Sequence, residues 1–145
     1  MTLTLFSDYS LRVLMFAAVK SSESFSIEEV AGAYGLPRHH VGKIITFLVQ
    51  KGYLNAQRGR GGGITLGKPP GEIRVGALIR ETESGAPLVE CFEQATNTCP
   101  LCGVCSLQGA LRQAWEAFFQ SLDKHTLADL TRKPAILRER LALTA

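Results

Sequence analysis

The sequence has no cysteine outside one short segment and no acidic residue across a long stretch, and it lacks an apolar run long enough to cross a membrane. The run from Val13 to Val19 is far shorter than the roughly 20 residues that a transmembrane helix needs. The residues before it carry Asp8 and one basic residue, Arg12, which argues against a basic signal-peptide leader. We therefore expect a cytoplasmic protein without a membrane partner, in which clustered thiols more often bind metal than form disulfides.

Acidic residues are absent from Val30 to Gly71, a stretch that contains six basic residues: Arg38, Lys43, Lys51, Arg58, Arg60 and Lys68. The whole chain has 16 basic and 13 acidic residues, so subtracting these six leaves a remainder that is mildly acidic. A solvated protein surface usually mixes both signs of charge. The uneven distribution therefore indicates a polyanionic partner.

Helical periodicity recurs through the first third of the chain. We expect a first helix with Ser7 as its N-cap and apolar residues at positions 11, 14, 15, 18 and 19. Ser26 and Glu29 form a capping box ahead of a second helix that Gly35 ends. A third, basic helix follows and ends at Gly52. Two short helices joined by a tight, glycine-containing turn predict a helix-turn-helix.

A β-hairpin is expected directly after these helices. Tyr53 and Leu54 begin one strand, Ile64 and Leu66 lie in the other, and a glycine-rich tip joins them. A further helix is expected in the stretch IRVGALIRETE. The predicted fold class is mainly α with a small β-hairpin wing: a winged helix-turn-helix at residues 1–85, a cysteine-bearing loop at 86–105, and a long dimerisation helix with a C-terminal tail at 106–145.

The helix predicted from Ser106 carries an apolar stripe: Leu107, Leu111, Trp115, Phe118 and Leu122. This stripe either packs onto the chain's own domain or forms the seam of a homodimer. We favour the seam, because a winged helix that reads operator DNA is normally duplicated by two-fold symmetry. Beyond this helix we expect one short helix, a break at Pro134 and a frayed tail.

The candidate DNA contacts are Arg38, His39, His40 and Lys43 in the basic helix, and Arg58 and Arg60 at the hairpin tip. Residues at the N-terminal end of a recognition helix face base edges, where arginine and lysine bind guanine. Arginines on a glycine-rich tip suit a narrow minor groove. The alternative is that all six are ordinary surface cations. The coincidence of the acid-free stretch with the helix-turn-helix favours DNA binding.

All four cysteines lie within fifteen positions: Cys91, Cys99, Cys102 and Cys105. Besides unrelated buried thiols, three kinds of site are open to this set. A structural zinc site usually pairs two CxxC motifs separated by about a dozen residues or more, and the second motif is missing here. A thiol–disulfide switch needs only neighbouring thiols. The CxxCxxC run with Pro100 is typical of iron–sulfur ligation by soft thiolates, so the spacing favours a cluster.

Five stretches along the chain carry a family resemblance: LTLFSDYSLRVLMFAAV, YGLPRHHVGKIITFLVQKGYL, RGRGGGITLGKPPGEIRVGALIRETE, CPLCGVC and FFQSLDKHTLADL. Together they resemble the NsrR-type nitric-oxide-sensing repressors, which belong to a family of bacterial winged-helix regulators that bind iron–sulfur clusters. The resemblance covers about residues 1 to 131. It implies a homodimer that binds double-stranded operator DNA and represses nitrosative-stress genes while its cluster is intact.

The resemblance also implies a ligand set for the cluster. Cys91, Cys99 and Cys105 match the family's three thiolate ligands, and Asp8 of the partner subunit matches its carboxylate ligand near the start of the first helix. Cys102 departs from the family pattern and is an alternative fourth ligand. Asp8 has an alternative role too, as a first-turn acid stabilised by the helix dipole. We expect a 4Fe–4S cluster, with 2Fe–2S as the alternative.

Two other functions are compatible with parts of the sequence. The long gap between Cys91 and Cys99 is also similar to the RirA-type repressors of the same family, which sense iron and oxygen. A small iron–sulfur electron-transfer protein, an enzyme subunit or a zinc-stabilised binding module are alternatives of a different class. The sequence has no second cysteine set, and its GRGGG run lacks the Lys-Ser/Thr of a P-loop. We therefore expect a repressor that is not an enzyme.

Overall fold

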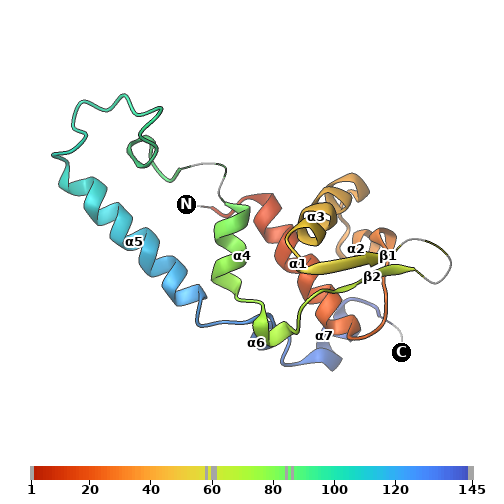
Figure 1. Cartoon of the computed structure of the whole chain (residues 1–145). Coiled ribbons are helices and arrows are strands. Elements are labelled where there is room, and N and C mark those ends of the chain that lie inside the picture. Colours follow the sequence, from red (N-terminus) through yellow and green to blue (C-terminus); the bar gives the residue numbers. More distant parts are fainter. Residues whose placement is uncertain (1, 58, 60–61, 84, 86, 144–145) are drawn as a thin grey trace.

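The computed structural model describes residues 2–57, 59, 62–83, 85 and 87–143 (Figure 1). Its elements in chain order are α1 (Leu5–Lys20), α2 (Ile27–Tyr34), α3 (Arg38–Gln50), β1 (Leu54–Gln57), β2 (Gly63–Leu66), the 3₁₀ helix η1 (Pro70–Glu72), α4 (Val75–Thr82), the 3₁₀ helix η2 (Glu90–Phe92), α5 (Ser106–Leu122), α6 (Leu127–Leu130) and α7 (Pro134–Arg140). The predicted class, mainly α with one small hairpin, is confirmed. No helix in the described part of the chain is long and apolar enough to span a membrane.

Helix α1 starts one turn earlier than expected. The prediction of Ser7 as its N-cap was wrong, because the side chain of Thr4 accepts a hydrogen bond of 3.2 Å from the Ser7 N–H and caps the helix. Ser7 therefore lies inside the first turn, where it is only 1% exposed. Its hydroxyl contacts Thr82 and Glu83 at the end of α4, a contact between residues far apart in the sequence.

The helix-turn-helix has the predicted caps. Ser26 and Glu29 form the capping box of α2, and Gly35 ends this helix with a φ of 64° in the left-handed region. The apolar faces of α1, α2 and α3 meet in one core, whose fully buried side chains include Leu14, Phe16, Val30, Val41 and Leu48. We call α1–α3 together with the hairpin the head.

The hairpin packs against the start of the helix-turn-helix. Strands β1 and β2 are antiparallel, with Leu54 opposite Leu66, and Phe25 pairs with Ile64 through two backbone hydrogen bonds of 3.0 and 2.9 Å. A Cβ at Gly63 would lie 2.7 Å from the Cβ of Ser24, so the close approach requires glycine. Backbone pairing with Phe25 thus fixes the hairpin to the segment that precedes α2.

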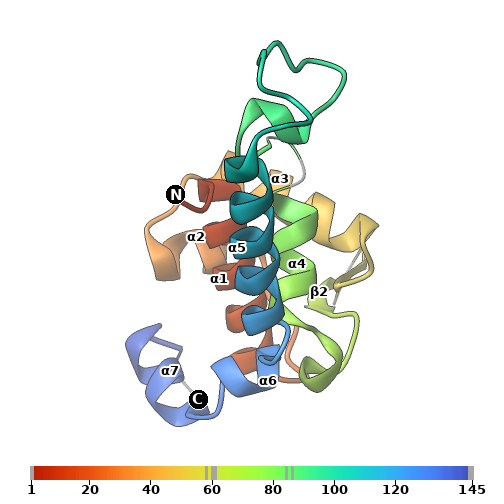
Figure 2. The same ribbon diagram turned by 90° about the vertical axis from the view of Figure 1, so that its left-hand side faces the viewer.

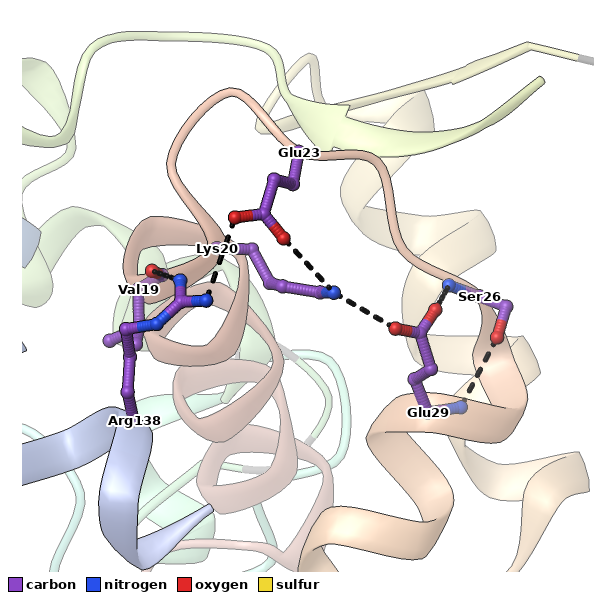
Figure 3. A network of polar contacts seen from close by, with 6 residues as sticks. All are labelled: Val19, Lys20, Glu23, Ser26, Glu29 and Arg138. Atoms are coloured by element: carbon purple, nitrogen blue, oxygen red, sulfur yellow. Dashed lines mark hydrogen bonds and ion pairs between the residues drawn. The ribbon is translucent and has the colours of Figure 1, made fainter. Parts of the chain in front are cut away.

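The prediction of a frayed tail was wrong. Pro134 is the first residue of α7, a position where the missing N–H of proline costs no hydrogen bond. Arg138 of α7 donates a hydrogen bond of 3.0 Å to the carbonyl of Val19 at the end of α1 and lies 3.5 Å from Glu23 (Figure 3). The C-terminal helix is therefore tied to the head.

The polar network of Figure 3 continues from the end of α1 to α2. The Nζ of Lys20 lies 3.5 Å from a carboxylate oxygen of Glu23 and 3.0 Å from one of Glu29. Partial burial acts to raise the pKa of Glu29, but hydrogen bonds from Lys20 and from the Ser26 N–H outweigh it and hold this pKa below its ordinary value. The hydrogen bond to Glu29 raises the pKa of Lys20 against the effect of burial.

Helices α4 and α5 form a second, smaller core of Val75, Ile79 and Phe119. Figures 1 and 2 show α5 beside α4 on one side of the head. The segment before α5 projects away from the head, past the N-terminal end of α5. We call residues 87–105 the cysteine segment. None of its side chains is buried.

Candidate DNA-binding surface and cysteine segment

The start of α3 presents the predicted DNA contacts. Val41, Ile44 and Leu48 bury one face of this helix in the core of the head, which leaves the other face exposed. Four predicted side chains lie on the exposed part of the first two turns: Arg38, His39, His40 and Lys43. The two histidine rings contact each other edge to face, with centroids 4.2 Å apart.

Arg38 forms an ion pair that the sequence did not predict. Its guanidinium donates to the carboxylate of Glu28 in the first turn of α2, although both side chains remain more than half exposed. An exposed ion pair of this kind is worth about 0–1 kcal/mol, so releasing Arg38 from Glu28 costs little. The predicted contacts Arg58 and Arg60 lie outside the described residues.

The cysteine segment holds all four thiols as free cysteines. Cys91 lies in η2, and Cys105 immediately precedes α5. Cys102 is exposed and its N–H donates to the carbonyl of Cys99 at 3.2 Å. The side-chain amide of Gln108 donates to the Cys91 carbonyl at 2.7 Å and so joins η2 to α5. This contact was not predicted, because no spacing rule connects the two residues.

The thiols fit an iron–sulfur cluster by chemistry, but their arrangement is not yet that of a ligand set. Soft thiolates in an irregular segment are the usual ligands of such clusters. Among the described residues, no three histidine, cysteine or acidic side chains gather closely enough to hold a metal ion. Bringing three sulfurs to one centre would require the segment to rearrange, and none of its side chains is buried in the core to oppose such a change.

Asp8 lies in the first turn of α1, as predicted, but forms an ion pair with Arg12. One carboxylate oxygen lies 2.8 Å from the guanidinium, and the side chains of Asp8 and Arg12 are 40% and 42% exposed. The i,i+4 spacing of an acid and a base is the sequence signal for this pair, which was not predicted. The exposed carboxylate is free to exchange Arg12 for another cation.

The apolar stripe of α5 divides into two parts. Trp115, Phe118 and Leu122 pack against the small core that α5 shares with α4. Leu107, nearer the cysteine segment, is 62% exposed. Self-packing therefore accounts for the C-terminal half of the stripe, whereas Leu107 in the N-terminal half stays exposed in the single chain.

Comparison with known proteins places the chain among bacterial regulators. Residues 3–133 match the Rrf2 family model, which is described as an iron-dependent transcriptional regulator. The chain is 46% identical over 142 residues to the HTH-type transcriptional regulator NsrR of Geobacillus kaustophilus, with 97% of each chain covered. It is 45% identical over 136 residues to the HTH-type transcriptional repressor NsrR of Streptomyces coelicolor, with 92% of this chain and 90% of the other covered.

The fold is similar to that of a solved regulator as well. The structure of CymR, the global cysteine regulator of B. subtilis, superposes with a TM-score of 0.66 at 26% identity, covering 91% of this chain and 97% of CymR. The similarity extends through the helices that follow the head. The predicted combination of a winged helix-turn-helix with a long following helix is thereby confirmed.

Proposed function

The chain belongs to the Rrf2 family of iron-dependent transcriptional regulators, and we propose that it is a homodimeric repressor controlled by an iron–sulfur cluster that reacts with nitric oxide. The observation that carries this proposal is the placement of two features in one short chain. The head presents four exposed basic or histidine side chains at the start of α3, and four free thiols lie on a separate, unburied segment that leads into α5. One part suits DNA, and the other suits a reactive cofactor.

We assign residues 1–85 to DNA binding, 86–105 to cluster binding, and 106–145 to dimerisation and the tail. Cys91, Cys99 and Cys105 would hold the cluster together with Asp8 of the partner subunit, and Cys102 is the alternative to Asp8. We favour 4Fe–4S over 2Fe–2S. When bound, the cluster would supply iron able to react with nitric oxide, and the Asp8 carboxylate would be a weaker ligand to that iron than the Cys102 thiolate.

The residues around Asp8 supply a path from this site to the recognition helix. Phe6, two residues before Asp8, contacts Phe47 of α3 with ring centroids 5.1 Å apart. A displacement of the start of α1 is therefore transmitted to α3 through this ring contact. When Asp8 is released, Arg12 is in place to pair with it, as the structure has it. The start of α1 then no longer has a connection to the partner subunit.

In a dimer, release of Asp8 would affect DNA binding because the two heads bind one operator together. The exposed half of the α5 stripe, with Leu107 at 62% exposure, is suited to meet its copy around a two-fold axis. Two recognition helices must then lie about 34 Å apart to enter successive major grooves. Loss of the connection between one head and the partner's cysteine segment changes this separation, and operator affinity falls.

The decisive test compares protein prepared without air with the same protein after loss of its metal. We expect iron and sulfide in the purified dimer, a visible absorption that nitric oxide bleaches, and a loss of operator binding that follows the bleaching. Mössbauer spectra distinguish 4Fe–4S from 2Fe–2S. Asp8→Ala and Cys102→Ala identify the fourth ligand, because only the variant that lacks a ligand changes the spectrum of the bound cluster.

Control titrations separate the proposed function from its alternatives. An iron chelator that releases the operator at concentrations where nitric oxide has no effect indicates an iron-responsive regulator. Zinc in place of iron and sulfide indicates a zinc-stabilised module. Full operator affinity after complete bleaching contradicts control by the cluster.

A further inference from the structure

The last turn of α4 is a junction between four parts of the molecule. Residues 80–83 each make polar contacts with another element: Arg80 with Asp123 after α5, Glu81 with Tyr53 and Lys51, Thr82 with Ser7, and Glu83 with Thr4 and Ser7. This turn immediately precedes the chain that leads to the cysteine segment. A change in its position therefore reaches α5, the hairpin and the start of α1 together.

Two of these contacts hold α4 in place from opposite ends of the chain. The guanidinium of Arg80 donates to both carboxylate oxygens of Asp123, at 2.9 and 2.7 Å, and lies 4.6 Å from the ring centroid of Phe119. A carboxylate oxygen of Glu83 accepts hydrogen bonds from the Thr4 N–H at 2.8 Å and from its hydroxyl at 2.9 Å. Bidentate and charge-assisted bonds of this kind fix geometry well.

Glu81 makes the contact that leads to the DNA-binding surface. The hydroxyl of Tyr53 donates to one of its carboxylate oxygens at 3.2 Å, and the Nζ of Lys51 lies 3.6 Å from the other. Lys51 follows the last residue of the recognition helix, and Tyr53 directly precedes β1. One carboxylate thus contacts the end of the recognition helix and the base of the hairpin.

The surroundings of Tyr53 restrict its movement. The residue is 5% exposed, its N–H donates to the Leu48 carbonyl of α3 at 2.9 Å, and its own carbonyl accepts from Gly67 after β2 at 2.8 Å. Burial and the neighbouring Glu81 raise the pKa of Tyr53 to about 12, so the hydroxyl keeps its proton as a donor. A partly desolvated hydroxyl–carboxylate pair adds little stability but fixes the orientation of its two elements.

We propose that Glu81 is a positioning residue for DNA binding, which sets the hairpin relative to the recognition helix through Tyr53 and Lys51. The proposal rests on the proposed function in so far as the bound polymer is operator DNA. Because Glu81 lies on α4, the last α-helix before the cysteine segment, it also couples a rearrangement of that segment to the hairpin. Such a movement would make or break the predicted contact of the hairpin tip with the minor groove. It would do so by changing the position of the hairpin, not the charge of its arginines.

The test uses the full-length protein in four variants. Tyr53→Phe removes only the hydroxyl, Glu81→Ala removes the carboxylate, and Glu81→Gln keeps an oxygen acceptor and serves as the conservative rescue. Tyr34→Phe is the matched control for loss of a tyrosine hydroxyl, since the Tyr34 ring packs near Phe16 in the head, with centroids 6.4 Å apart.

Two measurements are made on each variant: operator affinity at several salt concentrations, and amide hydrogen exchange of β1 and β2 without DNA. For Tyr53→Phe and Glu81→Ala we expect operator affinity about three- to tenfold lower, a salt dependence shallower by about one released counterion, and faster exchange in the hairpin. Glu81→Gln should restore most of each effect. Tyr34→Phe should match the unmodified protein. A purely structural role of Glu81 lowers the melting temperature but leaves the salt slope unchanged.

The outcomes distinguish this inference from the proposed function. If the unmodified protein binds no operator in any state, the proposed function is wrong, and hairpin exchange alone decides the role of Glu81. If the unmodified protein binds but Tyr53→Phe and Glu81→Ala keep its salt slope and hairpin exchange, the positioning role is wrong and the proposed function stands. A shallower slope with faster hairpin exchange, restored by Glu81→Gln, supports the positioning role.

Discussion

The head and the cysteine segment are ordered by different means. The head encloses a continuous core in which residues such as Leu14, Phe16 and Leu48 are 0% exposed. The cysteine segment is held by a few polar contacts, among them the bond from Gln108 to the Cys91 carbonyl and those from Thr98 to Glu90. The head combines apolar burial with caps and backbone pairing, whereas the cysteine segment lacks the burial that fixes a unique arrangement.

The two requirements of a regulator, DNA recognition and sensing, suit these two kinds of structure. A DNA reader needs recognition side chains at fixed positions, and burial of one face of α3 supplies that. A sensor needs a segment whose free energy changes strongly when a small group binds or leaves. An unburied segment meets this need, because binding of a group supplies order that the chain itself does not.

The largest expected effect comes from removing apolar volume in the head. Leu14→Ala leaves a cavity at a fully buried position and should lower the free energy of unfolding by about 2–5 kcal/mol, as urea titration would measure. The matched change Leu107→Ala lies at a position 62% exposed near the cysteine segment. At protein concentrations low enough for monomers it should change this free energy by less than about 0.5 kcal/mol.

Leu107→Ala has its effect on assembly instead. If the exposed half of the α5 stripe forms the dimer seam, sedimentation should show a higher dimer dissociation constant for Leu107→Ala than for the unmodified protein. A variant on the exposed polar face, such as Gln113→Ala, should leave this constant unchanged. Equal losses of unfolding free energy for Leu14→Ala and Leu107→Ala would contradict the contrast between the two regions.

Short-range signals in the sequence predicted much of the head. The capping box of Ser26 and Glu29 and the stop at Gly35 depend on neighbours within a few residues, and all are confirmed. The start of α1 was misplaced because Thr4 and Ser7 are both good caps, and the contacts that hold the buried Ser7 come from the distant Thr82 and Glu83. Spacing rules carry no information about contacts between residues so far apart.

The candidate site was predicted by residue type but not by arrangement. Four cysteines in fifteen positions indicate their own chemistry, and the family resemblance supplied their roles and that of Asp8. The proposed arrangement of the sulfurs depends on a bound group and a second subunit, and spacing rules within one chain describe neither. The tie from Arg138 to Val19 was missed for another reason, since it joins residues 119 positions apart.

A medium-sized effect is expected where α4 meets the end of α5. A Cβ at Gly76 would lie 2.9 Å from the backbone nitrogen of Asp123 and 2.2 Å from its Oδ1. Gly76→Ala should therefore separate the two helices and lower the melting temperature, at a cost of about 1–3 kcal/mol. The control is Gly109→Ala on α5, where a Cβ meets nothing within 4 Å and the change should be neutral or stabilising by up to about 1 kcal/mol. Equal destabilisation by both variants would show that α4 and the end of α5 are not tightly packed at Gly76.

The smallest expected effect concerns pH and the network of Figure 3. Because the pKa of Glu29 lies below its ordinary value of 4.5, its pairing with Lys20 stabilises the head above that pH and is lost as the pH falls through the lowered pKa. Glu29→Gln should thus be less stable than the unmodified protein at neutral pH by a few tenths of a kcal/mol, since solvent screens the exposed carboxylate. The difference should shrink in urea titrations at about pH 3. The control is Glu93→Gln in the cysteine segment. An equal, pH-dependent loss of unfolding free energy in this control would contradict a special role for the network of Lys20, Glu23 and Glu29.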